Sequence, residues 1–213
     1  MKMQIASLCL IEKGHVSFRV HLHEEVEARI DTSDPDALRR YFRDRIARCA
    51  RKEFGVVPFF WFVIENRTKS GTSTTRPHIH GEIQIVAHAN LPTTKHGSVL
   101  MKYRRIIAEN GIEVAERIYG RERTRQVLLD ATGNSESSNA VVGERNQRRN
   151  LWMRTPYFNF GNPDWVSYAF KNTRHASRRI GHRRLAISLE LNREAQRLWR
   201  LIREGESAME QWR

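Results

Sequence analysis

The segment of residues 76–85 shows the clearest alternation of apolar and polar positions in the chain. Its apolar positions are Ile79, Ile83 and Ile85, and its polar positions are His78, His80, Glu82 and Gln84. In a β-strand, alternation of period two places the two sets on opposite faces. His78 and His80 therefore point the same way, at a separation that lets two imidazoles bind one divalent metal ion. The spacing alone also fits a strand whose solvent-facing side carries two histidines.

Two further strands are predicted before this segment. Residues 16–23 alternate, with Val16, Phe18, Val20 and Leu22 toward the core and Ser17, Arg19, His21 and His23 on the other face. This strand therefore carries a second His-x-His pair. Residues 56–65 are apolar on both sides, which is typical of a central strand.

A polar turn of residues 66–77 joins the apolar strand to the histidine strand and predicts a hairpin. If Glu65 lies opposite His78, its carboxylate shares the face of both histidines, because cross-strand neighbours point the same way. A slip of one residue would send Glu65 to the other face. Glu82, which shares the strand face of the histidines, is the alternative carboxylate ligand.

Helical patterns occupy much of the remaining chain. Apolar positions with a period of 3.6 predict helices over residues 33–54, around residues 99–109, over residues 112–129 and from Asn192 onward. Residues 132–150 show no period and predict a mobile loop. Further strands are predicted at residues 151–158 and 185–191. The order of strand, helix, strand, strand, helix predicts one α+β domain over residues 1–213, with a C-terminal helical extension from about residue 192.

Asn162, Pro163 and Asp164 form a strong helix start, with Asn162 as the N-cap. On this helix the apolar side carries Val166, Ala169 and Phe170, and the polar side carries Tyr168 and Lys171. A surface tyrosine beside a surface lysine would explain this pair in isolation. The basic run of residues 174–184 follows and predicts contacts with phosphate groups.

The chain has 213 residues and a large excess of positive charge, with 37 Lys and Arg against 24 Asp and Glu, a net charge of +13. This balance favours nucleic acid as a partner, although a non-catalytic basic protein has the same balance. Cys9 and Cys49 are expected to be reduced thiols of a cytoplasmic protein. No segment approaches the ~20 apolar residues of a transmembrane helix, so we expect no membrane association. The chain has no Gly-rich phosphate loop, so we expect no attached nucleotide-driven helicase domain.

Taken in chain order, these motifs resemble the HUH endonucleases, and among them the single-tyrosine initiators of rolling-circle replication (Rep proteins). The matching residues are Glu65, the segment of residues 77–81 and the Tyr-x-x-Lys pair of Tyr168 and Lys171. The resemblance covers roughly residues 16–174. Relaxases carry their tyrosine before the histidines, whereas transposases of the IS200/IS605 type share the order found here.

The resemblance implies a ferredoxin-like antiparallel sheet with helices on one face and the active site on the open face. It implies that His78, His80 and Glu65 hold Mg²⁺ or Mn²⁺. Tyr168 would be the nucleophile, leaving a 5′-phosphotyrosine and a free 3′-OH, and Lys171 would lie beside the phosphate. The first strand lacks the aromatic-Leu-Thr signature of viral Rep proteins, and Tyr157 is not on the helix of Tyr168, so a second nucleophile for termination is not evident.

The expected function is sequence-specific nicking and joining of single-stranded DNA at the replication origin of a plasmid or phage in the bacterial cytoplasm. The expected partners are a hairpin or nick site in this DNA, a host helicase and a polymerase, and the oligomeric state stays open. The expected DNA contacts are Arg19, Arg67, Arg76, Arg174, Arg178 and Arg179. The alternatives are a single-strand transposase, a basic nucleic-acid-binding protein without activity and a zinc-dependent hydrolase.

Overall fold

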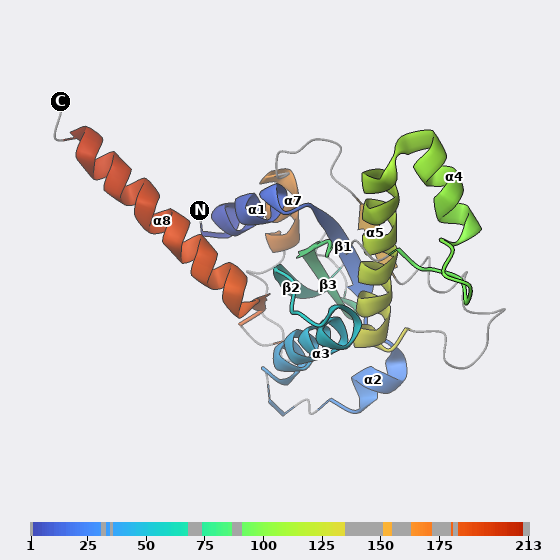
Figure 1. The fold of residues 1–213 in the computed structure, drawn as a ribbon. Helices are drawn as coiled ribbons and strands as arrows, with labels where there is room; N and C mark the ends of the chain where they lie inside the picture. The colour runs from blue at the N-terminus through green and yellow to red at the C-terminus, as the bar shows by residue number, and fades with distance from the viewer. Residues whose placement is uncertain are drawn as a thin grey trace.

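The computed structural model describes residues 2–30, 33–34, 36–67, 74–86, 91–134, 151–154, 163–171, 180 and 183–210. It contains a five-stranded antiparallel sheet with the strand order β4-β1-β3-β2-β5 (Figure 1). The first four strands, with helices between β1 and β2 and between β3 and β4, have the ferredoxin-like arrangement. The predicted α+β class and antiparallel sheet are confirmed.

The elements follow in chain order. The strands are β1 (His15–His21), β2 (Phe60–Arg67), β3 (Thr74–Gln84), β4 (Leu151–Arg154) and β5 (Leu185–Ile187). The helices are α1 (Lys2–Glu12), α2 (Glu24–Ala28), α3 (Ala37–Phe54), α4 (Met101–Asn110), α5 (Ile112–Thr132), α7 (Pro163–Phe170) and α8 (Leu189–Glu210). Compared with the predictions, α1 and α2 are additional helices, and α8 begins before Asn192 because β5 ends at Ile187. The first residue of the predicted loop, Thr132, is the last residue of α5, and residues 135–150 lie outside the described part of the chain.

The apolar face of the sheet forms the main core. The alternating residues of β1, β2 and β3 meet α3 and α5 there, with Phe18, Phe42, Phe62, Ile79 and Leu128 among the fully buried side chains. Because one face of each strand is buried in this layer, the strand register is strongly specified. The alternation read from the sequence is confirmed for β1 and β3.

The opposite face of the sheet is partly covered by a second group of helices. Trp61 and Val63 of β2 pack there against Leu10 of α1, Ala169 of α7 and Leu191 of α8. The family resemblance implied helices on one face only, and the structure adds this second layer at the β2 side. The physical reason is the composition of β2, which is apolar on both faces and needs cover on both. Beyond this packed region, α8 projects away from the body of the molecule (Figure 1).

Gly81 lies where β2 and β3 approach most closely. It pairs with Phe62, and a Cβ atom at this position would overlap the carbonyl oxygen of Trp61 and lie 2.9 Å from the Cα of Phe62. Since both are main-chain atoms of a central strand, neither can move aside without disturbing the ladder. The glycine between His80 and Glu82 therefore permits the close pairing that the hairpin needs.

Replacing Gly81 with alanine should lower the free energy of unfolding by about 1–3 kcal/mol, because the added methyl group overpacks the strand pair. Gly205→Ala is the matched control. Nothing lies within 4 Å of a Cβ there, and the residue is in a helix, so this change should raise the free energy of unfolding by about 0.5–1 kcal/mol. Urea denaturation of both variants measures the difference. A Gly81→Ala variant as stable as wild type would contradict the close approach.

Candidate metal centre

Glu65, His78 and His80 form one buried group on the sheet face opposite the main core. Glu65 of β2 pairs directly with His78 of β3, so the predicted register is confirmed. The Glu65 Oε2 atom lies 3.3 Å from His80 Nε2 and 3.8 Å from His78 Nε2. The three donor atoms lie within 4.8 Å of one another, and all three residues are almost fully buried. Two imidazoles and a carboxylate in this arrangement could hold a metal ion.

The main chain orients the ring of His78. Its Nδ1 atom lies 3.1 Å from the carbonyl oxygen of Arg76, which can only accept a hydrogen bond. Nδ1 therefore carries the proton and Nε2 keeps its lone pair, directed to the side of Glu65. Such a fixed tautomer is characteristic of histidines that bind metals.

The protonation states suit metal binding. Burial and the neighbouring His80 lower the pKa of His78 to about 3, and burial also lowers the pKa of His80 despite the opposing effect of Glu65. Burial by itself raises the pKa of Glu65, but hydrogen bonds from His80 and Lys171 outweigh it, and the net pKa lies below its ordinary value. Both imidazoles are therefore neutral and the carboxylate is ionised near neutral pH.

Lys171 reaches this group from the end of α7. Its Nζ atom donates a hydrogen bond of 2.9 Å to Glu65 Oε2, the same oxygen that faces both histidines. Tyr168 lies three residues earlier on α7, and its side chain is outside the described part of the chain. Val166 and Ala169 bury the other side of α7 against the sheet. The helix of the Tyr-x-x-Lys motif therefore lies on the sheet face that carries Glu65.

Glu82, the alternative ligand in the sequence analysis, has other partners. Its Oε2 atom accepts hydrogen bonds of 2.8 Å from Ser7 Oγ of α1 and from Trp61 Nε1. Its Oε1 atom lies 3.7 Å from His15 Nε2. Glu82 therefore attaches α1 to the sheet, and Glu65 is the carboxylate that completes the histidine group.

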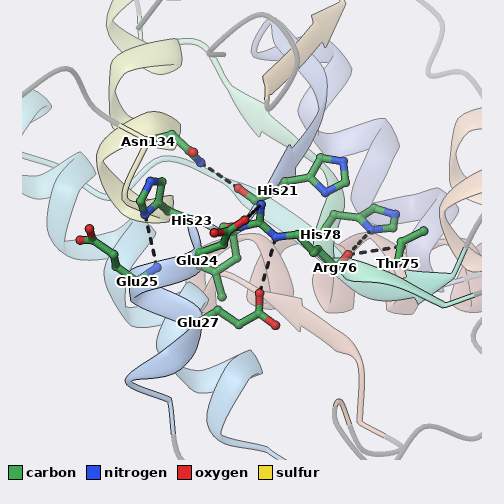
Figure 2. Close-up of polar contacts among 10 residues, drawn as sticks. His21, His23, Glu24, Glu25, Glu27, Thr75, Arg76, His78 and Asn134 are labelled. Carbon is green, nitrogen blue, oxygen red and sulfur yellow. Dashed lines mark hydrogen bonds and ion pairs between the residues drawn. The ribbon is translucent and has the colours of Figure 1, made fainter. Parts of the chain in front are cut away.

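The two histidines of the second His-x-His pair, His21 and His23, lie in different surroundings. His21 pairs with His78 across the β1–β3 ladder, and the centroids of their rings are 5.0 Å apart. His23 lies beyond the end of β1, where its Nδ1 accepts a hydrogen bond from the Glu25 main chain and caps α2. Figure 2 shows the His21 ring beside the His78 ring and the His23 ring turned away. The contact of His21 with His78 depends on the β1–β3 register, which local alternation does not predict.

Of the arginines expected to contact DNA, three lie in described parts of the chain. Arg19 pairs with His80 across β1 and β3, and its guanidinium lies 3.1 Å from His21 Nε2. Arg67 ends β2. Arg76 donates to the carbonyl oxygen of Leu22 at 2.6 Å and forms ion pairs with Glu24 and Glu27 of α2 (Figure 2).

The charge of Arg76 is thus balanced by two acidic residues, which the sequence analysis did not anticipate. Arg19 lies beside the histidine group, through its pairing with His80 and its contact with His21. Arg174, Arg178 and Arg179 lie outside the described residues, as does Tyr157.

No protein-family model, no curated protein and no solved structure matches this chain. Among the described helices, none combines the length and the apolar character needed to cross a bilayer.

Removal of one histidine should weaken binding of a divalent ion. Calorimetric titration of wild type and His80→Ala with Mn²⁺, Mg²⁺ and Zn²⁺ in parallel should show a loss of more than about tenfold in affinity for the ion that binds best, because a direct ligand is removed. The control is His96→Ala, which changes an exposed histidine. Equal affinities for wild type and His80→Ala would place the metal elsewhere.

The buried histidines should also make the protein sensitive to acid. The pKa of His78 is about 3 in the folded protein against an ordinary value of 6.5, so below pH 6.5 the unfolded chain binds the additional proton. The free energy of unfolding should therefore fall as the pH falls below 6.5, by about 2 kcal/mol at pH 5 from this residue. Denaturation with a chelator present should show this fall in wild type and in His96→Gln, and a shallower one in His78→Gln. Parallel curves for all three would contradict the buried, neutral imidazole.

Proposed function

We propose that this chain is a metal-dependent endonuclease of the HUH type, which nicks and rejoins single-stranded DNA through a covalent bond between Tyr168 and a 5′-phosphate. The observation that carries this proposal is the 2.9 Å contact between Lys171 Nζ and Glu65 Oε2. This contact joins the Tyr-x-x-Lys motif to the buried Glu65–His78–His80 group, although Glu65 and Lys171 are 106 residues apart in sequence.

Glu65, His78 and His80 would hold the ion. Two imidazoles and one carboxylate suit Mn²⁺ better than Mg²⁺, which prefers oxygen ligands. An ion bound there supplies Lewis-acid polarisation of a phosphoryl oxygen. The two neutral imidazoles and the ionised Glu65 are in the protonation states that such binding requires.

In the proposed reaction, the phenolic oxygen of Tyr168 attacks the phosphorus of one phosphodiester bond. The bond from oxygen to phosphorus forms, the bond from phosphorus to the 3′-oxygen breaks, and the proton lost by the phenol is balanced by the proton that the 3′-hydroxyl gains. A phenol has an ordinary pKa near 10, so a cation such as the Lys171 ammonium favours the reactive phenolate. Because the covalent bond preserves the energy of the phosphodiester, the reverse attack can rejoin the strand.

The proposed biological role is the start of rolling-circle replication, with a single-stranded origin as substrate and the free 3′-OH as primer. The net charge of +13 supports a nucleic-acid substrate. A single-strand transposase would use the same chemistry at the same residues. A basic binding protein without activity would bind DNA but would not depend on Tyr168 or on a metal.

A covalent adduct between protein and DNA would test the proposed function. Wild-type protein incubated with Mn²⁺ and a mixed pool of single-stranded oligonucleotides should give a protein band shifted by attached DNA on a denaturing gel. The shifted band should disappear in Tyr168→Phe, in His80→Ala and in wild type with a chelator, because each removes one part of the reaction.

Tyr157→Phe is the matched control and should keep the adduct. An adduct that survives in Tyr168→Phe but is lost in Tyr157→Phe would move the nucleophile to Tyr157. If DNA binding falls steeply with salt and no variant or chelator changes it, with no adduct formed, the binding-protein alternative holds.

A further inference from the structure

One carboxylate oxygen, Glu65 Oε2, lies between the other side chains of the candidate metal centre. Glu65 Oε2 is 2.9 Å from Lys171 Nζ, 3.3 Å from His80 Nε2 and 3.8 Å from His78 Nε2. The side chain of Glu65 is fully buried and that of Lys171 is one-fifth exposed. A metal ion held by the two imidazoles and Glu65 would therefore share its carboxylate oxygen with an ammonium group.

Two cations at one carboxylate oppose each other. The Lys171 ammonium is a compact point charge, and its repulsion of a divalent ion a few ångströms away is strong wherever water is excluded. Glu65 also cannot turn toward solvent, because it is buried in a central strand. Either Lys171 weakens the binding of the ion, or it gives up its contact with Glu65.

Lys171 has a position that allows it to move. It follows Phe170, the last residue of α7, whereas Val166 and Ala169 keep the helix packed on the sheet and Phe170 stacks on Trp61 with ring centroids 6.2 Å apart. The helix can therefore stay in place while the lysine side chain changes partner. A cation beside the carboxyl end of a helix is also stabilised by the exposed carbonyl groups there.

We propose that Lys171 and the metal ion compete for Glu65, so that metal binding releases the Lys171 ammonium from its ion pair. This inference rests on the proposed function and states how metal binding would control Lys171 at the same site. In the presence of the ion, the released ammonium becomes available to the scissile phosphate next to Tyr168. Without the ion, Glu65 holds it, so the charge needed at the phosphate is delivered only when the metal is bound.

The test measures Mn²⁺ affinity by calorimetry for wild type, Lys171→Met and Lys171→Arg. If Lys171 competes with the ion, Lys171→Met should bind Mn²⁺ roughly tenfold more tightly than wild type, because the repelling charge is removed. Lys171→Arg keeps the charge and should bind about as wild type. The matched control is Lys102→Met, which removes the same charge from an ion pair with Glu122 on α4 and α5 and should leave the affinity unchanged. A purely structural lysine would give weaker binding on removal, so equal or weaker binding by Lys171→Met overturns the proposal.

A second measurement uses wild-type protein alone and does not depend on the folding of a variant. Reductive methylation of lysines, followed by mass spectrometry, should modify Lys171 several times faster in Mn²⁺ than in chelator, with Lys102 as the internal reference. An unchanged rate at Lys171 overturns the release.

The outcomes separate this proposal from the proposed function. Equal Mn²⁺ binding by wild type and Lys171→Met, together with a covalent DNA adduct, overturns the competition and leaves the endonuclease intact. Failure of both proteins to bind Mn²⁺ overturns the metal centre and the competition together. Binding by Lys171→Met alone supports the competition.

Discussion

The pairing of Glu65 with His78 is the constraint on which both the fold and the candidate site depend. In this register, Phe62, Ile64 and Ile79 enter the main core while Glu65 and both histidines lie together on the opposite face. A slip of one residue would bury the Glu65 carboxylate in the apolar layer, where no partner could offset the loss of hydration. The core and the Glu65–His78–His80 group are therefore specified by the same ladder, and Gly81 allows its two strands to approach closely enough to form it.

A buried polar face needs partners, and the second helical layer supplies them. One carboxylate oxygen of Glu82 accepts hydrogen bonds from Ser7 of α1 and from Trp61, and Glu65 accepts one from Lys171 at the end of α7. Carboxylates buried without such partners would destabilise the fold by several kcal/mol. The packing of α1 and α7 and the ionisation of the site are thus linked, since the helices that cover the apolar side chains of β2 also bring the compensating donors.

The sequence predicted the strands and the shared face of His78 and His80, because these depend on local alternation. It offered the pairing of Glu65 with His78 only as one possible register, which the β2–β3 ladder decides. It did not predict that α1 covers the sheet face opposite the main core, since the apolar residues of a helix do not indicate which surface they will contact. The contact of His21 with His78 and the acidic partners of Arg76 depend on the pairing of β1 with β3, which are separated by more than fifty residues. Such long-range relations are fixed by tertiary packing and leave no periodic signal in the chain.

The balance of charge gives Lys171 a physical role in the proposed reaction. With neutral histidines, Glu65 and Lys171 together sum to zero charge. A divalent ion adds two positive charges, and a phosphodiester with a phenolate adds two negative ones, so the complete set is again neutral. Removal of Lys171 from that set would take away one positive charge, and Arg19 and Arg184, the other cations that act on this group, would have to compensate for it. A lysine that pairs with Glu65 and then with the phosphate compensates one negative charge at each stage, and without it both stages would lack that compensation.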